Sequence, residues 1–123
     1  MQFLRTYEIL GTVYLIHFEQ EFYGRLHYLG WAPPIASLSP SAHDREEGFK
    51  CRIQRHRDGT GSQLLSSLKR AKIDWQVVMV WTKKTLRDEQ RMKSWKKSKQ
   101  FCPRCSPGIS AIEHGGIAIQ SMK

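Results

Sequence analysis

The chain has 123 residues, 40% of them hydrophobic, which suits one domain with a modest core. A net charge of +9 favours a polyanionic partner such as nucleic acid, although a basic protein that is merely soluble would carry the same charge. No segment approaches the roughly 20 apolar residues that span a bilayer, so no membrane contact is expected. No secretory signal pattern opens the chain, and three cysteines do not make a disulfide framework. A cytoplasmic protein is therefore expected.

Two strands open the predicted fold. Residues 11–18 (GTVYLIHF) are β-branched and aromatic, and residues 26–31 (LHYLGW) form a second such run. The polar segment 19–25 between them contains Gly24 and predicts an antiparallel hairpin with a longish loop. Residues 32–42, with three prolines and three serines, predict an exposed loop.

Helices and a third strand follow. Asp44 is the expected N-cap of a helix that runs to Arg57. Periodicity and composition then predict a helix over 62–71, a strand over 75–81 and a last helix over 85–99. This order predicts the α+β class, with a small three-stranded antiparallel sheet flanked by helices.

The first predicted helix carries two kinds of side chain. Phe49 and Ile53, with Cys51 near them, give it a thin apolar stripe. Basic and imidazole side chains are expected on or near the other flank, at Arg52, Arg55 and His56.

Several short motifs occur in one order: Thr12-Val13-Tyr14, Tyr28-Leu29-Gly30, Arg52 with Arg55-His56, Glu89, and a basic tail ending in Cys102-Pro-Arg-Cys105. With these residues the sequence resembles the GIY-YIG nuclease superfamily, and the tail resembles that of short stand-alone bacterial members. The resemblance covers roughly residues 11–105. It implies a nuclease domain over 1–105, followed by a C-terminal tail over 106–123 that is expected to be flexible.

The resemblance implies a metal-dependent endonuclease that hydrolyses DNA phosphodiester bonds. Tyr14 would accept a proton from the attacking water, and Tyr28 would hydrogen-bond the phosphate or that water. Because a phenol with a pKa of about 10 is a poor base, Arg52 and a metal ion would have to lower that pKa. Arg52 would also clamp the phosphate with its planar fork, and His56 would orient the phosphate or assist proton transfer. The structural alternatives are that the two tyrosines only pack their rings, that Arg52 is a solvated helix charge, and that His56 caps the helix.

Glu89 is the metal ligand that the resemblance implies. It would bind one Mg²⁺ or Mn²⁺ through oxygen and leave other positions for water and substrate. The alternative is an ion pair with Arg87 or Lys93 on the same helix.

Nine basic residues lie between Lys83 and Arg104, against only Asp88 and Glu89. Such a run can neutralise the phosphates of a duplex without reading its sequence, although a solvated face is the usual alternative. The expected nucleic-acid-binding residues are Arg55, Lys93, Lys96, Lys97 and Lys99.

Cys102 and Cys105 have the spacing of half a zinc site. Only Cys51 and His114 stand out as further donors, so plain thiols are expected rather than a structural Zn²⁺.

Two rival functions stay open. The first is a non-catalytic nucleic-acid-binding module with the GIY-YIG fold, favoured by Thr12 in place of glycine and by the long segment between Gly30 and Arg52. The second is an unrelated α+β protein whose basic tail binds RNA. If the chain is a nuclease, one active site cuts one strand, so a double-strand break would need a transient homodimer or a second encounter.

Overall fold

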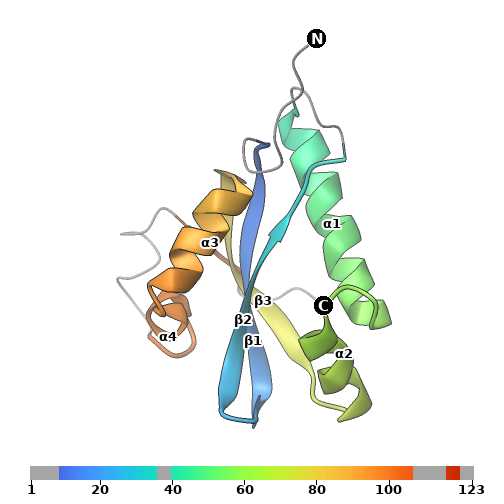
Figure 1. Cartoon of the computed structure of the whole chain (residues 1–123), viewed down its shortest axis with the longest axis vertical. Coiled ribbons are helices and arrows are strands. Elements are labelled where there is room, and N and C mark those ends of the chain that lie inside the picture. The colour runs from blue at the N-terminus through green and yellow to red at the C-terminus, as the bar shows by residue number, and fades with distance from the viewer. Residues whose placement is uncertain (1–8, 36–39, 107–115, 120–123) are drawn as a thin grey trace.

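A four-stranded antiparallel sheet forms the centre of the structure (Figure 1). The structure is a computed structural model that describes residues 9–35, 40–106 and 116–119. The strands, in the order β2-β1-β3-β4, are β1 (Gly11–Phe22), β2 (Arg25–Ala32), β3 (Trp75–Lys84) and β4 (Ile117–Ala118).

The α+β class is confirmed, but the prediction of three strands is wrong. Ile117 and Ala118 pair with Val80 and Met79, and the N–H of Ile119 donates to the carbonyl of Val78 at 2.9 Å. The open edge of β3 offers unpaired backbone groups that even a two-residue strand can satisfy. Such a short strand has no periodic pattern by which the sequence could reveal it. The rest of the predicted tail, 107–115 and 120–123, lies outside the described residues.

The hairpin of β1 and β2 is tighter than predicted. Both strands continue through the polar segment, and only Tyr23 and Gly24 turn the chain, with φ of 49° and 77°. Positive φ at both central residues suits the twist of a two-residue hairpin. The resulting register places Gly30 opposite Tyr14.

The helices are α1 (Ala42–Asp58), α2 (Gln63–Arg70), α3 (Leu86–Ser94) and α4 (Ser98–Phe101). The expected N-cap of α1 is wrong by three residues. The N-cap is Ser41, whose side-chain hydroxyl accepts from the N–H of Asp44. The carboxylate of Asp44 accepts in turn from the N–H of Ser41, so Asp44 is the N3 residue of a capping box. The predicted last helix is two helices, because Lys96 between them has a left-handed φ of 54°.

The helices cover both faces of the sheet, with α1 and α2 on one face and α3 and α4 on the other (Figure 1). Because alternate side chains of a strand point to opposite faces, β1 contributes to two cores. Tyr14 and Ile16 pack in the core beneath α1 and α2, whereas Val13 and Leu15 pack with the residues of α3 and α4. His56 of α1 is 1% exposed, so its expected place on the polar flank is wrong.

Within the three described ranges, no helix combines the length and apolar character needed to cross a bilayer.

Candidate functional site

Two tyrosines meet on the sheet face that α1 covers. Tyr14 of β1 and Tyr28 of β2 have ring centroids 6.3 Å apart. Gly30 makes this arrangement possible, because a Cβ there would lie 2.5 Å from the phenol oxygen of Tyr14 and 2.8 Å from the ring of Tyr28. The glycine of the second motif is therefore required by packing against both rings.

His56 joins the two tyrosines from α1. Its Nε2 lies 2.6 Å from the phenol oxygen of Tyr14, and its ring centroid lies 5.7 Å from those of Tyr14 and Tyr28. Gly61 packs against the other edge of the imidazole, where a Cβ would overlap Nδ1. The site is thus shaped by one glycine on β2 and another in the turn after α1.

Arg52 lies one helical turn before His56, and its guanidinium interacts with both phenols. Two buried nitrogens of the described residues have no hydrogen-bond partner: Nε of Arg52 and Nδ1 of His56. A buried polar group without a partner costs about 1–3 kcal/mol, so such groups call for a functional explanation. An anionic ligand would supply the acceptor that Arg52 lacks.

The protonation of the buried pair follows from its surroundings. Burial and the neighbouring Tyr28 raise the pKa of the Tyr14 phenol, and they outweigh the hydrogen bond and charge of Arg52, which lower it. Arg52 acts in the expected direction but does not by itself make Tyr14 a phenolate. Burial, together with the charge of Arg52, lowers the pKa of His56 to about 4. At neutral pH the pair is a phenol beside a neutral imidazole.

Glu89 reaches the site region from α3. Its side chain is buried, and its carboxylate pairs with Nζ of Lys93 at 3.0 Å. Nζ of Lys93 in turn lies 5.8 Å from the ring centroid of Tyr28. The carboxylate of the neighbouring Asp88 accepts from the N–H of Thr85, the N-cap of α3, and so is already engaged and does not compete with Glu89 as a ligand. The ion pair with Lys93 that the sequence left as an alternative is therefore present.

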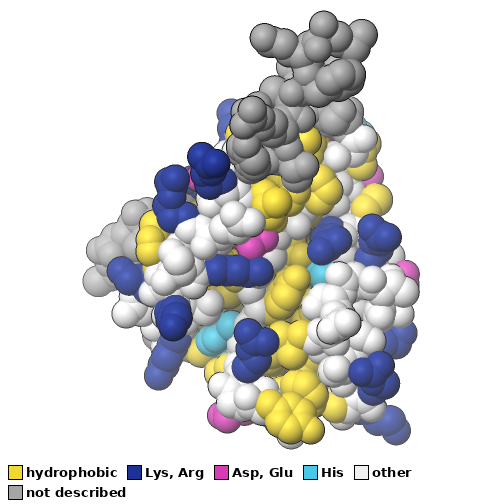
Figure 2. Space-filling view, viewed as in Figure 1, with side chains coloured by type: hydrophobic (Ala, Val, Ile, Leu, Met, Phe, Trp, Pro, Cys, Tyr) yellow, Lys and Arg dark blue, Asp and Glu magenta, His cyan; other side chains and the backbone are white. Residues whose placement is uncertain are grey.

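A cavity of about 620 Å³ lies beside Tyr28 and is bordered by Leu64, Lys93 and Lys96. Figure 2 shows Lys and Arg side chains over α1 and α2 on one side and over α3 and α4 on the other, with hydrophobic side chains between them over the sheet. This arrangement suits a polyanion lying across β2. The expected nucleic-acid-binding residues Arg55, Lys93, Lys96, Lys97 and Lys99 are all exposed.

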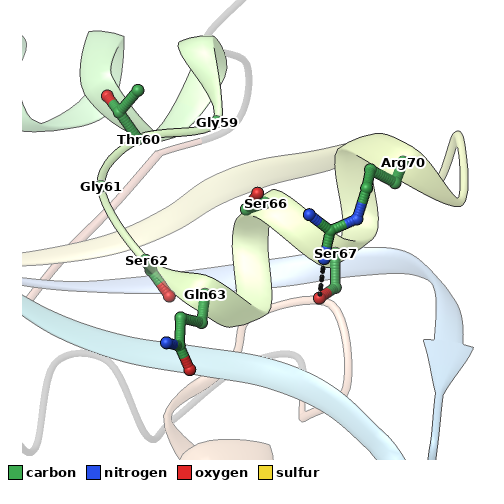
Figure 3. A pocket seen from close by; sticks show the side chains of 8 residues that line it. All are labelled: Gly59, Thr60, Gly61, Ser62, Gln63, Ser66, Ser67 and Arg70. Carbon is green, nitrogen blue, oxygen red and sulfur yellow. Dashed lines mark hydrogen bonds between the residues drawn. The ribbon is translucent and has the colours of Figure 1, made fainter.

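A second cavity, of about 510 Å³, lies at the turn between α1 and α2 (Figure 3). Its lining is polar, and Arg70 donates to the hydroxyl of Ser67 at 3.1 Å within it. It is lined by none of the predicted site residues.

The opposite face of the sheet holds a cluster that the sequence revealed only in part. His17, His27, Cys102 and Cys105 offer four ligand atoms that all lie within 4.8 Å of one another and could hold a metal ion. The expectation of plain thiols overlooked both histidines, because they are distant in sequence from the cysteines. The available signal was the hairpin, in which His17 pairs directly with His27. Cys51 is exposed on α1, and His114 lies outside the described residues.

No protein-family model, curated protein or solved structure matches this chain. The GIY-YIG resemblance therefore depends on the motif residues themselves.

Proposed function

We propose that this protein is a metal-dependent endonuclease of the GIY-YIG type that hydrolyses DNA phosphodiester bonds. The observation that carries the proposal is the convergence of Tyr14, Tyr28, Arg52 and His56 on one face of the sheet. These residues come from two strands and a helix, and together they provide a proton path and a phosphate clamp.

Tyr14 and His56 provide the proton path. The phenol donates to the neutral imidazole at 2.6 Å, within the distance for direct proton transfer. As Tyr14 takes a proton from the attacking water, its own proton can move to Nε2 of His56. A free phenolate then never has to accumulate, but the proton passes to an imidazole whose pKa is about 4, so His56 would hold it only until the leaving oxygen or solvent takes it.

Arg52 and Tyr28 bind the phosphate. Both are partly exposed, whereas Tyr14 and His56 are buried beneath them. A guanidinium matches two phosphate oxygens with its parallel N–H groups, and the half-buried Arg52 can offer such a pair. Charge fixed at this position stabilises the negative charge that grows on the phosphate in the transition state.

Glu89 fits the role of metal ligand, because Mg²⁺ and Mn²⁺ take carboxylate oxygen and complete their shell with water and substrate phosphate. When bound, such an ion would supply positive charge that stabilises the negative charge developing during hydrolysis. Lys93, which now holds the carboxylate, would turn to the DNA backbone. The basic side chains flanking β2 would bind the duplex on either side, and cutting both strands would need a transient homodimer or a second encounter.

The test is nicking of supercoiled plasmid with added Mg²⁺ or Mn²⁺. Arg52→Ala and Glu89→Gln should each slow nicking at least 100-fold, since removal of one preorganised electrostatic group typically costs about 10²–10³ in rate. Two matched controls, Arg70→Ala and Glu21→Gln, change the same charges at exposed positions outside the site and should leave the rate unchanged. Equal rates for all four variants would refute the assignment.

A non-catalytic nucleic-acid-binding module is the second candidate. It is favoured by the complete burial of Tyr14, which is 0% exposed, and by the pairing of Glu89 with Lys93. In that case the same protein would shift plasmid or duplex DNA in a gel without nicking it in either metal. If it neither shifts nor nicks DNA, both candidates are excluded.

A further inference from the structure

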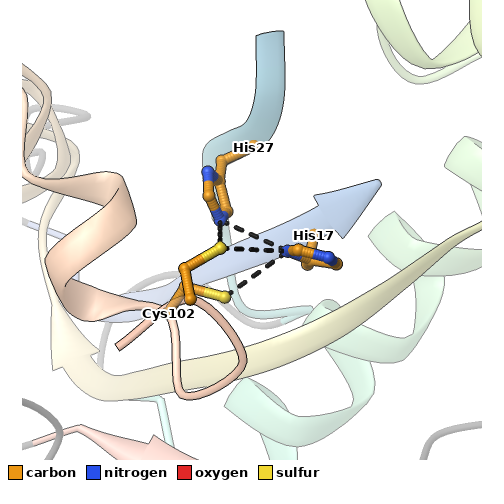
Figure 4. Close-up of side chains that lie close together, drawn as sticks. His17, His27 and Cys102 are labelled. Atoms are coloured by element: carbon orange, nitrogen blue, oxygen red, sulfur yellow. Dashed lines mark hydrogen bonds between the residues drawn. The ribbon is translucent and has the colours of Figure 1, made fainter. Parts of the chain in front are cut away.

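The His/Cys cluster on the α3–α4 face has the dimensions of a metal centre. His17 comes from β1, His27 from β2, and Cys102 and Cys105 from the turn after α4; the donor atoms point toward one another (Figure 4). Nδ1 of His17 lies 3.3 Å from Nε2 of His27, 3.5 Å from Sγ of Cys102 and 3.7 Å from Sγ of Cys105. Nε2 of His27 lies 3.4 Å from Sγ of Cys105.

These separations match a tetrahedral zinc ion. With bonds of about 2.05 Å to nitrogen and about 2.3 Å to sulfur, tetrahedral angles place two nitrogens about 3.3 Å apart and a nitrogen about 3.6 Å from a sulfur. The nitrogen pair lies at 3.3 Å, three of the four nitrogen–sulfur pairs lie at 3.4–3.7 Å, and all four donor atoms lie within 4.8 Å of one another. One central ion can therefore bind all four donors with little movement of the side chains.

Hydrogen bonding alone does not account for the cluster. Nδ1 of His17 faces His27, Cys102 and Cys105 at once. A ring nitrogen carries either one proton or one lone pair and so satisfies one such partner well. A shared cation at the centre gives every donor a partner.

We propose that His17, His27, Cys102 and Cys105 form a structural zinc site. Two imidazoles and two thiolates are the ligand set of Cys₂His₂ zinc centres, and sulfur donors disfavour Mg²⁺ and Mn²⁺. All four positions are filled by protein, so the ion has no open position for a substrate. Binding releases one proton from each cysteine, and two thiolates cancel the charge of Zn²⁺, which permits burial of the centre.

Hydrogen bonds hold the turn that carries the cysteines in place. The backbone N–H of Ser106 donates to the carbonyl of Cys102 at 2.8 Å. The side chain of Arg104 donates to Glu19 at 2.7 Å and to Gln76 at 2.8 Å, which holds the turn against β1 and β3. Both cysteines are thus positioned over the hairpin histidines.

The zinc ion would join two segments of the fold that are distant in sequence. It links the hairpin to the segment after α4, and so anchors the basic helices α3 and α4 to the sheet. His27 directly precedes Tyr28, so the centre also fixes β2 beside the proposed active site. The zinc site nevertheless stands independently of the nuclease proposal, because none of its ligands belongs to that site.

Metal analysis of the purified full chain, expressed with zinc in the medium, tests the proposal directly. We expect one zinc per chain by inductively coupled plasma mass spectrometry. Cys102→Ser and Cys105→Ser should each lower bound zinc at least tenfold, whereas Cys51→Ser, which removes the exposed third cysteine, should keep it. Loss of zinc in Cys51→Ser alone, or a wild-type chain without zinc, overturns the proposal.

Two further measurements cover variants that fail to fold. His17→Gln keeps both thiols, and its Co²⁺ adduct should lose the intense visible bands of a tetrahedral dithiolate site that the wild type shows. Stripping zinc from the wild type with a chelator should lower Tm, and Zn²⁺ but not Mg²⁺ should restore it. Unchanged spectra, an unchanged Tm, or a Cys102–Cys105 disulfide in the native protein contradicts the site. Nicking is not a readout here, so its absence leaves this result unaffected.

Discussion

The two faces of the sheet carry different chemistry on the same two strands. On the α1–α2 face, Tyr14 and Tyr28 meet an arginine and a histidine, and the carboxylate proposed as metal ligand, Glu89, comes from α3. On the α3–α4 face, His17 and His27 meet two sulfurs. Adjacent residues of β2, His27 and Tyr28, contribute to opposite faces because side chains alternate along a strand.

The two sets of donor atoms favour different metal ions. Oxygen donors with room for water suit Mg²⁺ or Mn²⁺, whereas a closed set of nitrogen and sulfur suits zinc. One chain can therefore hold a structural ion and still depend on a second, exchangeable ion for catalysis. A chelator such as EDTA acts on both, so loss of nicking in EDTA followed by rescue with Mg²⁺ alone would assign catalysis to the exchangeable ion and not to zinc.

The largest expected effect separates the faces by activity. Tyr14→Phe removes the hydroxyl through which the proton would pass in the proposed mechanism, and nicking should then fall about 10²–10⁴-fold, the usual contribution of general acid–base catalysis. Bound zinc should stay unchanged. The control Tyr23→Phe alters a 90% exposed tyrosine at the hairpin turn and should be silent in both assays. Full activity of Tyr14→Phe would remove Tyr14 from the mechanism.

Acid should weaken the α1–α2 face through His56. Its folded pKa is about 4, below the ordinary value of 6.5, so the unfolded chain binds more protons between these values. The contribution of His56 to the free energy of unfolding should thus be fully present above pH 6.5, and the free energy should fall by up to about 3 kcal/mol as the pH drops toward 4. Urea unfolding at several pH values should show this slope in the wild type and in the exposed control His43→Gln, but a smaller slope in His56→Gln. Parallel slopes in all three proteins would contradict the assignment.

Gly30→Ala should disturb the tyrosine face and spare the zinc face. The added methyl group meets both phenol rings, and overpacking of this kind costs about 1–3 kcal/mol. Unfolding and nicking should both show the change, with zinc content retained. Gly24→Ala strains a left-handed backbone but meets no atom within 4 Å, so it should lower stability without a specific loss of nicking. Equal nicking by the two variants would argue against a precise fit at Gly30.

The smallest expected effect concerns the surface lysines beyond the two faces. A triple change of Lys96, Lys97 and Lys99 to Gln should weaken binding of every duplex alike and reduce the slope of log K against log salt by up to about 3. Changing Lys50, Lys69 and Lys72 to Gln alters the net charge equally at exposed positions of α1, α2 and the turn after α2. Indistinguishable salt slopes for the two triple variants would leave only a general charge effect.

Local patterns predicted much of the fold. The β-branched runs placed β1, β2 and β3, and apolar residues at helical spacing placed α1, α2 and the start of α3 to within a few residues. Errors arose where tertiary contacts decide: the two residues of β4 pair only because β3 leaves an open edge, and Lys96 divides the last helix by a backbone conformation that no local pattern marks.

The candidate sites, like the fold, were predicted only as far as local sequence allows. The sequence placed tyrosine, arginine and histidine at motif positions, but burial made His56 a partner of Tyr14 and raised the pKa of that phenol. Neither effect follows from residue type, because burial depends on which face of α1 meets the sheet.

By itself the sequence determined the α+β class, the basic charge and the residue types available for chemistry, since these follow from composition and short-range periodicity. Only the tertiary structure decided which residues meet. Cys105 lies 88 residues from His17 in the sequence, yet its Sγ lies 3.7 Å from Nδ1 of His17. Long-range pairing of that kind depends on strand register and helix packing, which no local segment encodes.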